Sequence, residues 1–156
     1  MEGTLRERED EQACITAALD AAVVGRGTAL FFRGEPGLGK TALLALAAVD
    51  SRFAVVRIGG PGMEQAYPFA LVQQVMESLP RACGVAPEEL IGGLTPLRTL
   101  LRRFILSKAP SGAAPACFEV VYAWYWLLAS MAERRPILLC LDDLHWSDPD
   151  SLEAVR

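Results

Sequence analysis

The spacing of apolar and polar residues along the chain changes repeatedly between a helical period and short continuous apolar runs. Apolar positions three and four residues apart, with capping residues at their ends, predict helices. These helices are expected over residues 7–24, 40–49, 69–79 and 95–108, and in a last segment opened by Asp148 and Pro149.

Short apolar runs that stop at glycine or acidic residues predict buried strands. They occur at about residues 29–33, 53–58 and 137–141. Helical segments separate these runs, and strands that alternate with helices favour an α/β fold with a parallel sheet. A mostly helical insertion is expected between the second and third strands, over about residues 68–133.

The longest apolar run covers residues 116–132 and contains Glu119. It is short for a membrane span, and a charge lies inside it. Its part from Val121 to Leu128 is apolar on every face of a helix, which predicts a helix buried within a layered domain. An aromatic ligand-binding box is the alternative.

The composition is that of a globular protein, with 52% hydrophobic and 22% charged residues in a chain of 156, a length that fits one domain. The formal net charge of −4 gives the chain no overall attraction to nucleic acid or anionic lipid. No apolar core follows a basic start at the N-terminus, and the four cysteines lack metal-binding spacing. We therefore expect a cytoplasmic protein without a membrane partner.

One segment between the first predicted strand and the second predicted helix has a specific chemistry. It reads Gly34-Glu35-Pro36-Gly37-Leu38-Gly39-Lys40-Thr41 and fits the phosphate-binding pattern G-x-x-x-x-G-K-[ST] in full. Glycines let the backbone wrap closely around phosphate oxygens, and the following helix adds its positive N-terminal end. We expect all eight residues to bind a nucleoside triphosphate, with ATP and Mg²⁺ as cofactors. The alternative is a glycine-rich turn without a ligand.

Within this loop, Lys40 is expected to reach the β- and γ-phosphates, and the Thr41 hydroxyl to hold Mg²⁺. A P-loop protein also needs a carboxylate at the end of a second strand, where it orients the metal. The apolar run at 137–141 ends in Asp142 and Asp143. Asp142 is therefore the expected metal-side carboxylate, and Asp143 the expected catalytic base or water-positioning residue.

Other polar and aromatic residues near these motifs have simpler expected roles. His145, the only histidine, is interpreted as a structural or solvent-edge residue, and Trp146 as a packing residue. Three arginines on the predicted helix at 95–108 are interpreted as a solvated face, with phosphate or nucleic-acid contact as the alternative; they are Arg98, Arg102 and Arg103.

Three segments occur in an order that resembles a known family: Leu5-Arg6-Glu7-Arg8-Glu9, the phosphate loop, and Leu141-Asp142-Asp143-Leu144-His145-Trp146-Ser147-Asp148. Together with Tyr67-Pro68-Phe69, they are similar to the N-terminal ATPase region of the large ATP-binding LuxR-type regulators of bacteria. That family belongs to the AAA-related STAND group of signalling ATPases. The resemblance covers nearly the whole chain.

The resemblance implies an ATP-driven switch with slow hydrolysis, helical sensor repeats and a C-terminal DNA-binding helix-turn-helix. It places Lys40 and Thr41 on the triphosphate and Mg²⁺, Asp142 in the Walker B position and Asp143 in the position of the catalytic acid. Many relatives have Glu at that last position, and the shorter Asp implies slow turnover. The segment near Leu5 resembles the stretch that lies beside the adenine.

The family continues beyond the point at which this sequence ends, with a sensor strand, a helical lid, the repeats and the DNA-binding domain. We therefore expect a single partial domain over residues 1–156, a three-layer P-loop NTPase fold of the AAA-like class that is incomplete at the C-terminus. The isolated chain is expected to be poorly stable and to bind nucleotide weakly, with no direct nucleic-acid binding. Direct pairing of the strands at 29–33 and 137–141 is the alternative way to close the sheet.

Three functional hypotheses follow. The leading one is an ATP-binding regulatory switch domain of a bacterial signalling or transcription regulator. The others are a stand-alone ATPase or small-molecule kinase, and an interaction module that does not bind nucleotide.

Overall fold

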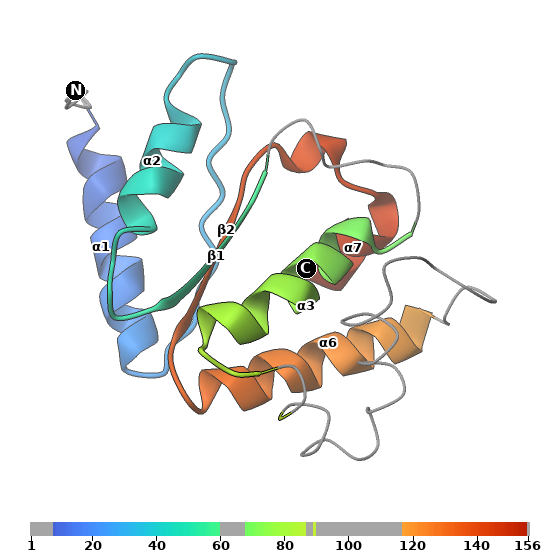
Figure 1. Ribbon diagram of the computed structural model, residues 1–156. Helices are drawn as coiled ribbons and strands as arrows, with labels where there is room; N and C mark the ends of the chain where they lie inside the picture. The colour runs from blue at the N-terminus through green and yellow to red at the C-terminus, as the bar shows by residue number, and fades with distance from the viewer. Residues whose placement is uncertain (1–7, 60–67, 87–88, 90–116, 156) are drawn as a thin grey trace. The chain divides into compact units, whose positions relative to one another are not determined.

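The computed structural model in Figure 1 describes residues 8–59, 68–86, 89 and 117–155. The chain divides into two compact units, Met1–Phe53 and Ala54–Arg156. Each unit is described by itself below. The predicted helix at 95–108, with its three arginines, lies outside the described residues, as do the segments around Leu5 and Tyr67. The single domain over residues 1–156 stays a prediction.

The first unit contains helices α1 (Glu9–Val23) and α2 (Lys40–Ala47). Three acidic side chains in the first turn of α1 complement the positive end of the helix dipole. The helix stops where Gly25 takes a left-handed backbone with φ of 81°. α1 and α2 lie side by side, and their buried residues are Ile15 on α1 and Leu43 and Ala47 on α2.

The strand predicted at 29–33 is not formed. These residues belong to an irregular connection between α1 and α2, and Leu30 and Phe31 are 43% and 69% exposed. A strand exists only as part of a hydrogen-bonded ladder, and the described residues of this unit contain helices and connections but no strand with which residues 29–33 could pair. The apolar run therefore has no partner within its own unit.

The second unit contains the strands β1 (Ala54–Ile58) and β2 (Ile137–Leu141), which agree with the runs predicted at 53–58 and 137–141. They pair in parallel, with Ala54 opposite Ile137 and Ile58 opposite Leu141. A small parallel sheet with helices is compatible with an α/β P-loop fold.

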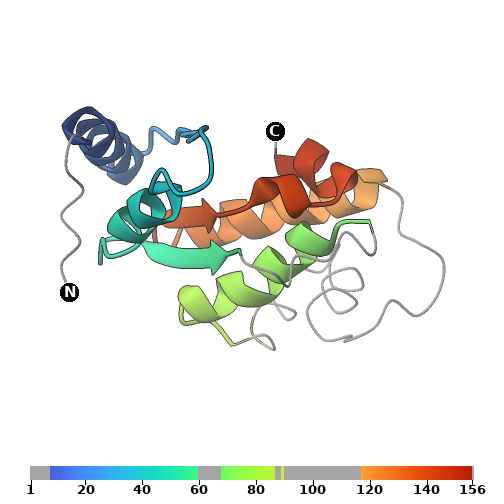
Figure 2. The same cartoon turned by 90° about the horizontal axis from the view of Figure 1, so that it is seen from above.

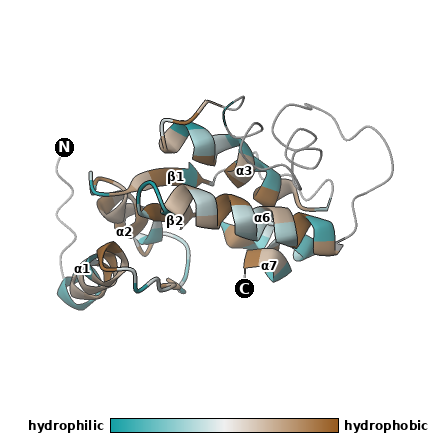
Figure 3. Ribbon diagram, turned by 90° about the horizontal axis from the view of Figure 1, so that it is seen from below, coloured by the Kyte–Doolittle hydropathy of each residue, from teal (hydrophilic) through white to brown (hydrophobic). Residues whose placement is uncertain are grey.

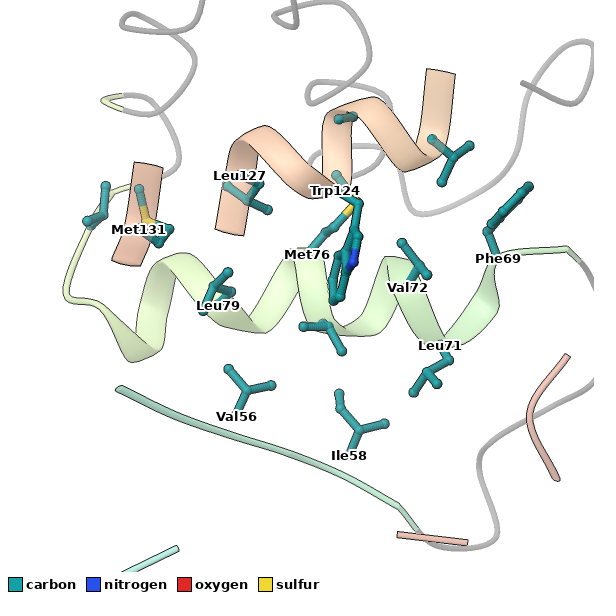
Figure 4. Close-up of a cluster of buried hydrophobic side chains, with 14 residues drawn as sticks. Val56, Ile58, Phe69, Leu71, Val72, Met76, Leu79, Trp124, Leu127 and Met131 are labelled. Carbon is teal, nitrogen blue, oxygen red and sulfur yellow. The ribbon is translucent and has the colours of Figure 1, made fainter. Parts of the chain in front are cut away.

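Among the described residues of this unit, the helical elements beside the sheet are α3 (Ala70–Ala82), α6 (Cys117–Ala132), the short 3₁₀ helix η2 (Leu144–Trp146) and α7 (Pro149–Val155). α3 lies between β1 and α6, and alternate residues of β1, Val56 and Ile58, point toward it (Figure 4). Figure 2, a view from above, shows the arrows of β1 and β2 pointing in the same direction. The largest fully buried apolar side chains of this core are Leu71, Met76, Leu79, Leu127, Val56, Val72, Val75 and Val120.

The expectation that α6 is buried on every face is wrong. One face, which includes Val120 and Leu127, is fully buried in the core. The other exposes a row of aromatic rings, with Phe118 75%, Tyr122 41%, Tyr125 62% and Trp126 41% exposed. Brown and pale segments alternate along α6 in the hydropathy colouring of Figure 3. Tyr122, Tyr125 and Trp126 carry a polar group on an apolar ring, which makes exposure tolerable, whereas Phe118 is exposed in the first turn of the helix.

Among the described residues, no helix has both the length and the apolar character required to cross a lipid bilayer.

Candidate functional site

The glycine-rich loop leads directly into α2 in the first unit. Gly37 and Gly39 have left-handed backbones, with φ of 85° and 76°, and Gly39 is the N-cap residue of α2. Lys40 is the first residue of the helix, and the first helical hydrogen bond joins the N–H of Leu43 to the carbonyl of Gly39. Only glycine adopts such angles at little cost, which explains its presence at both positions.

The ammonium group of Lys40 lies against the same loop. Its Nζ donates hydrogen bonds to the carbonyl oxygens of Gly34 at 3.0 Å and Glu35 at 2.9 Å. Residues 35–38 form a turn inside the loop, in which the N–H of Leu38 lies 3.5 Å from the carbonyl oxygen of Glu35. The structure therefore brings the loop backbone and its lysine together. Thr41 follows on α2 and is exposed.

The loop is also tied to the start of α1 by a contact that the sequence analysis missed. The Arg8 guanidinium donates to the carbonyl oxygen of Leu38 at 2.7 Å and to the Glu11 carboxylate at 2.6 Å. A backbone hydrogen bond and the Arg8 contact lower the pKa of Glu11. The resemblance placed the segment around Leu5 near the nucleotide, but no local pattern singled out Arg8.

In the second unit, the acidic strand end continues the pairing of the sheet. The N–H of Asp142 donates to the carbonyl of Ile58 at 2.8 Å, one residue beyond β2. Gly59 follows Ile58, and a Cβ atom on Gly59 would lie 2.7 Å from the Cβ of Asp142. That separation is too short for two carbon atoms, so glycine at position 59 leaves the room that Asp142 occupies.

Asp143 has an unusual backbone and an exposed side chain. Its φ is 53°, in the left-handed region, and its N–H donates to Oδ1 of Asp142 at 3.0 Å. The side chains of Asp143 and His145 are 44% and 66% exposed, with 3.9 Å between the Asp143 Oδ1 and His145 Nδ1 atoms. The exposed histidine agrees with a solvent-edge role, whereas Trp146 is 55% exposed and is not the packing residue expected.

A third carboxylate in this unit, Asp148, was predicted only as the start of α7. It is 3% exposed, and its Oδ1 accepts from the N–H groups of Ser151 and, across the unit, of Phe69, both at 2.8 Å. Its Oδ2 is 3.4 Å from the N–H of Leu71. Burial on its own would raise the pKa of Asp148, but the hydrogen bonds from Ser151, Phe69 and Leu71 outweigh it and hold the pKa below its ordinary value.

The residues present fit the groups that the motif implies. Apart from its chain neighbours, no heavy atom lies within 4 Å of the place of a Cβ on Gly37, so a phosphate meets open backbone there. Lys40 supplies a positive charge at the same loop. Thr41 of the first unit and Asp142 of the second each carry an oxygen of the hard kind that Mg²⁺ prefers. Within the described part of the chain, no cluster of His, Cys, Asp and Glu forms an all-protein metal site.

The glycine-rich loop, its lysine and a parallel strand that ends in paired acids define a P-loop NTPase region of the AAA type. The chain belongs to the AAA ATPase domain family, whose model matches residues 4–156. Domains of this family generally bind ATP with Mg²⁺. Neither the comparison with curated proteins nor the comparison with solved structures found a significant match.

Proposed function

We propose that the chain binds ATP with Mg²⁺ and acts as a regulatory switch domain of a bacterial signalling or transcription regulator of the LuxR type. Membership of the AAA ATPase domain family supports nucleotide binding. The regulatory role rests on the resemblance of the segment from Leu141 to Asp148 to those regulators.

One observation carries the proposal: two left-handed glycines lie immediately before a helix whose first residue is Lys40. That arrangement presents open backbone, a helix N-terminus and an ammonium group at one loop. A triphosphate is the common metabolite that satisfies all three, because it combines several anionic oxygens with a narrow shape.

Each site residue then has a role that its chemistry allows. The backbone of Gly34, Glu35, Pro36, Gly37, Leu38 and Gly39 surrounds the phosphates, and Lys40 exchanges its two loop carbonyls for phosphate oxygens. Thr41 and Asp142 hold Mg²⁺, which neutralises phosphate charge when it is bound. Asp143 orients the attacking water and accepts its proton.

The length of the Asp143 side chain supports a switch rather than a fast enzyme. Asp is one methylene shorter than Glu, so its carboxylate stands farther from a water that a Glu would contact. Small misplacements of a catalytic group lower rates strongly. Phosphate release on the order of 10⁻² s⁻¹ or slower is expected, as in nucleotide switches that hydrolyse without a partner.

Titration with a fluorescent ATP analogue, with and without Mg²⁺, tests binding. Lys40→Ala should weaken binding about 10- to 100-fold, because it removes charge-assisted hydrogen bonds worth about 1.5–3 kcal/mol. Arg26→Ala is the matched control, because Arg26 is an exposed cation of the same unit outside the loop. Asp142→Asn should remove only the gain in affinity for the ATP analogue that Mg²⁺ provides. Asp150→Asn, which changes an exposed acid of the same unit, is its control.

Phosphate release by the wild type then separates the classes of function. Tight binding with slow release supports the switch, and multiple turnover at rates above about 1 s⁻¹, typical of metabolic kinases, contradicts it. Absence of ATP binding by a folded wild type would leave an interaction module as the function.

A further inference from the structure

We propose that Asp148 is a positioning residue for Asp143. The buried carboxylate of Asp148 is hydrogen-bonded to the N-terminus of α3 and thereby holds in place the segment that follows Asp143. This inference rests on the proposed function, because it concerns the residue that is assigned to the attacking water. It adds a connection between two distant parts of the second unit that neither motif contains.

The contacts of Asp148 go beyond those of a helix N-cap. An N-cap carboxylate ordinarily accepts from one backbone N–H of its own helix, as the Ser151 N–H does here. The same carboxylate also accepts from Phe69 and Leu71, 79 and 77 residues earlier in the sequence. Ser151, which is fully buried, extends the connection because its Oγ accepts from the N–H of Val72 at 3.3 Å.

α3 depends on these acceptors. The first turn of any α-helix has N–H groups without helical partners, and its N-cap residue usually supplies an oxygen. The N-cap of α3 is Phe69, whose side chain has no oxygen. Asp148 and Ser151 therefore provide the acceptors that α3 lacks, and in return the N–H groups stabilise a buried negative charge.

Phe69 itself is held in a costly conformation. Its φ is 64°, in the left-handed region, where a bulky residue is strained. Its ring is buried and its N–H donates to Asp148. Such a backbone persists only when its surroundings fix it, so the α3 N-terminus offers Asp148 a defined attachment point.

The segment between Asp143 and Asp148 is short and internally bonded. The N–H of Trp146 donates to the carbonyl of Asp143 at 2.9 Å, and that of Ser147 to Leu144 at 3.1 Å. At its other end, Asp142 is bonded to Ile58 of β1. Residues 142–148 are therefore attached at both ends, to β1 and to α3, and the left-handed backbone of Asp143 lies between the two attachments. Loss of the Asp148 contacts removes the direct attachment of this segment to α3 and leaves only the one through Ser151.

Amide hydrogen exchange measures this attachment independently of any nucleotide chemistry. In Asp148→Asn, one acceptor oxygen and the negative charge are lost, while size and shape are kept. Faster exchange is expected in residues 69–72 and also at Trp146 and Ser147. Asp150→Asn, an exposed acid two residues away, should exchange as the wild type. Faster exchange confined to α7 would overturn the proposal, because it would show an ordinary helix cap.

Kinetics supply the second measurement. Asp148→Asn should lower the rate of phosphate release about tenfold, while the Kd for the ATP analogue changes less than about twofold, since loss of orientation affects the hydrolytic step. Ser151→Ala removes the acceptor of the Val72 N–H and the side-chain hydrogen bond of Ser151 to Asp148. It should lower the rate in the same way but by less, and it is the variant to measure if Asp148→Asn does not fold. An unchanged rate in folded variants, or equal losses of rate and affinity, would overturn the proposal.

The two proposals fail in different ways. A wild type that binds ATP without releasing phosphate contradicts hydrolysis in the proposed function, and the exchange comparison alone then decides whether Asp148 holds the segment. A wild type that binds no ATP contradicts the proposed function as a whole, and with it a positioning role.

Discussion

Gly59 sets the space available to Asp142, the carboxylate that we propose to hold Mg²⁺. The Cβ of an alanine there would lie 2.7 Å from the Cβ of Asp142 and 3.4 Å from its Cα, so the backbone after β2 must move. We predict that Gly59→Ala weakens the binding of Mg²⁺–ATP about tenfold and leaves binding without Mg²⁺ unchanged, because the proposed role of Asp142 is to hold the metal. Titrations in Mg²⁺ and in EDTA measure both.

Gly27→Ala is the matched control for this substitution. Nothing lies within 4 Å of a Cβ at Gly27, and its φ is not positive, so alanine fits without strain. Equal losses of affinity in the two variants would show that the effect of Gly59→Ala does not come from its contact with Asp142.

Asp148 gives a pH dependence of stability with a defined sign. Its pKa in the folded chain lies below the ordinary value, so the unfolded chain binds the proton more readily. The stabilisation is fully present above the ordinary pKa of about 4 and is lost as pH falls through that value and then through the folded pKa. Asp148→Asn should therefore lose less free energy of unfolding between pH 6 and pH 3 than the wild type.

Denaturant unfolding at a series of pH values tests this sign. Glu11 and Asp50 also have lowered pKa values, so the difference between variants, and not the wild-type curve, isolates Asp148. Asp150→Asn should keep the wild-type acid dependence. An Asp148→Asn curve parallel to that of the wild type would contradict the prediction.

Single residues were predictable where a local pattern encodes them. The glycines at 37 and 39 and the position of Lys40 at the start of α2 follow from the motif alone. The attachment of Asp148 to α3 does not, because its acceptor–donor pairs join residues 77 and 79 positions apart. The sequence predicts that Asp148 caps its own helix, α7. It contains no local signal that Asp148 also caps α3.

At the scale of elements, α6 shows how burial differs between the faces of one helix. Leu127 is fully buried, whereas Tyr125, two residues earlier, is 62% exposed. We predict that Leu127→Ala lowers the free energy of unfolding by about 2–5 kcal/mol, because it leaves a cavity between α6 and α3. Tyr125→Ala should cost less than about 1 kcal/mol, since that ring is mostly in water.

Urea unfolding of the two variants measures this difference. A large loss of stability in Tyr125→Ala would mean that the aromatic row is covered in solution. Similar small losses in both variants would contradict the position of Leu127 in the core.

Apolar runs predicted strands correctly where a partner exists in the same unit. Residues 54–58 and 137–141 pair with each other, and each provides the hydrogen-bond partners for one edge of the other. Residues 29–33 have the same apolar character but form no strand. Apolar character specifies what a strand would bury, whereas a ladder also requires a neighbour, which is a property of the tertiary structure. The burial of α6 was mispredicted for the same reason, because composition does not say how many layers surround a helix.

At the scale of the whole molecule, the proposed function requires residues of both units. Lys40 belongs to the first and Asp142 to the second. If both act on one bound nucleotide, their effects on Mg²⁺–ATP affinity are coupled. We predict that the double variant Lys40→Ala/Asp142→Asn loses less binding free energy than the two single variants together, by at least about 0.5 kcal/mol.

A double-mutant cycle of analogue affinities measures this coupling. A parallel cycle with Arg26→Ala in place of Lys40→Ala should be additive, because Arg26 is an exposed residue outside the loop. Strict additivity in the Lys40 cycle would mean that the two residues do not act on the same nucleotide.

Trp146 has a practical value that follows from its place in η2. Its indole is 55% exposed, 5.1 Å from the ring of His145 and three residues after Asp143, whereas Trp124 is buried in the core. Indole emission shifts in wavelength with the polarity of its surroundings. The chain thus carries its own optical reporter on the segment that we assign to hydrolysis, and replacement of Trp124 and Trp126 by phenylalanine would isolate that reporter without an added dye.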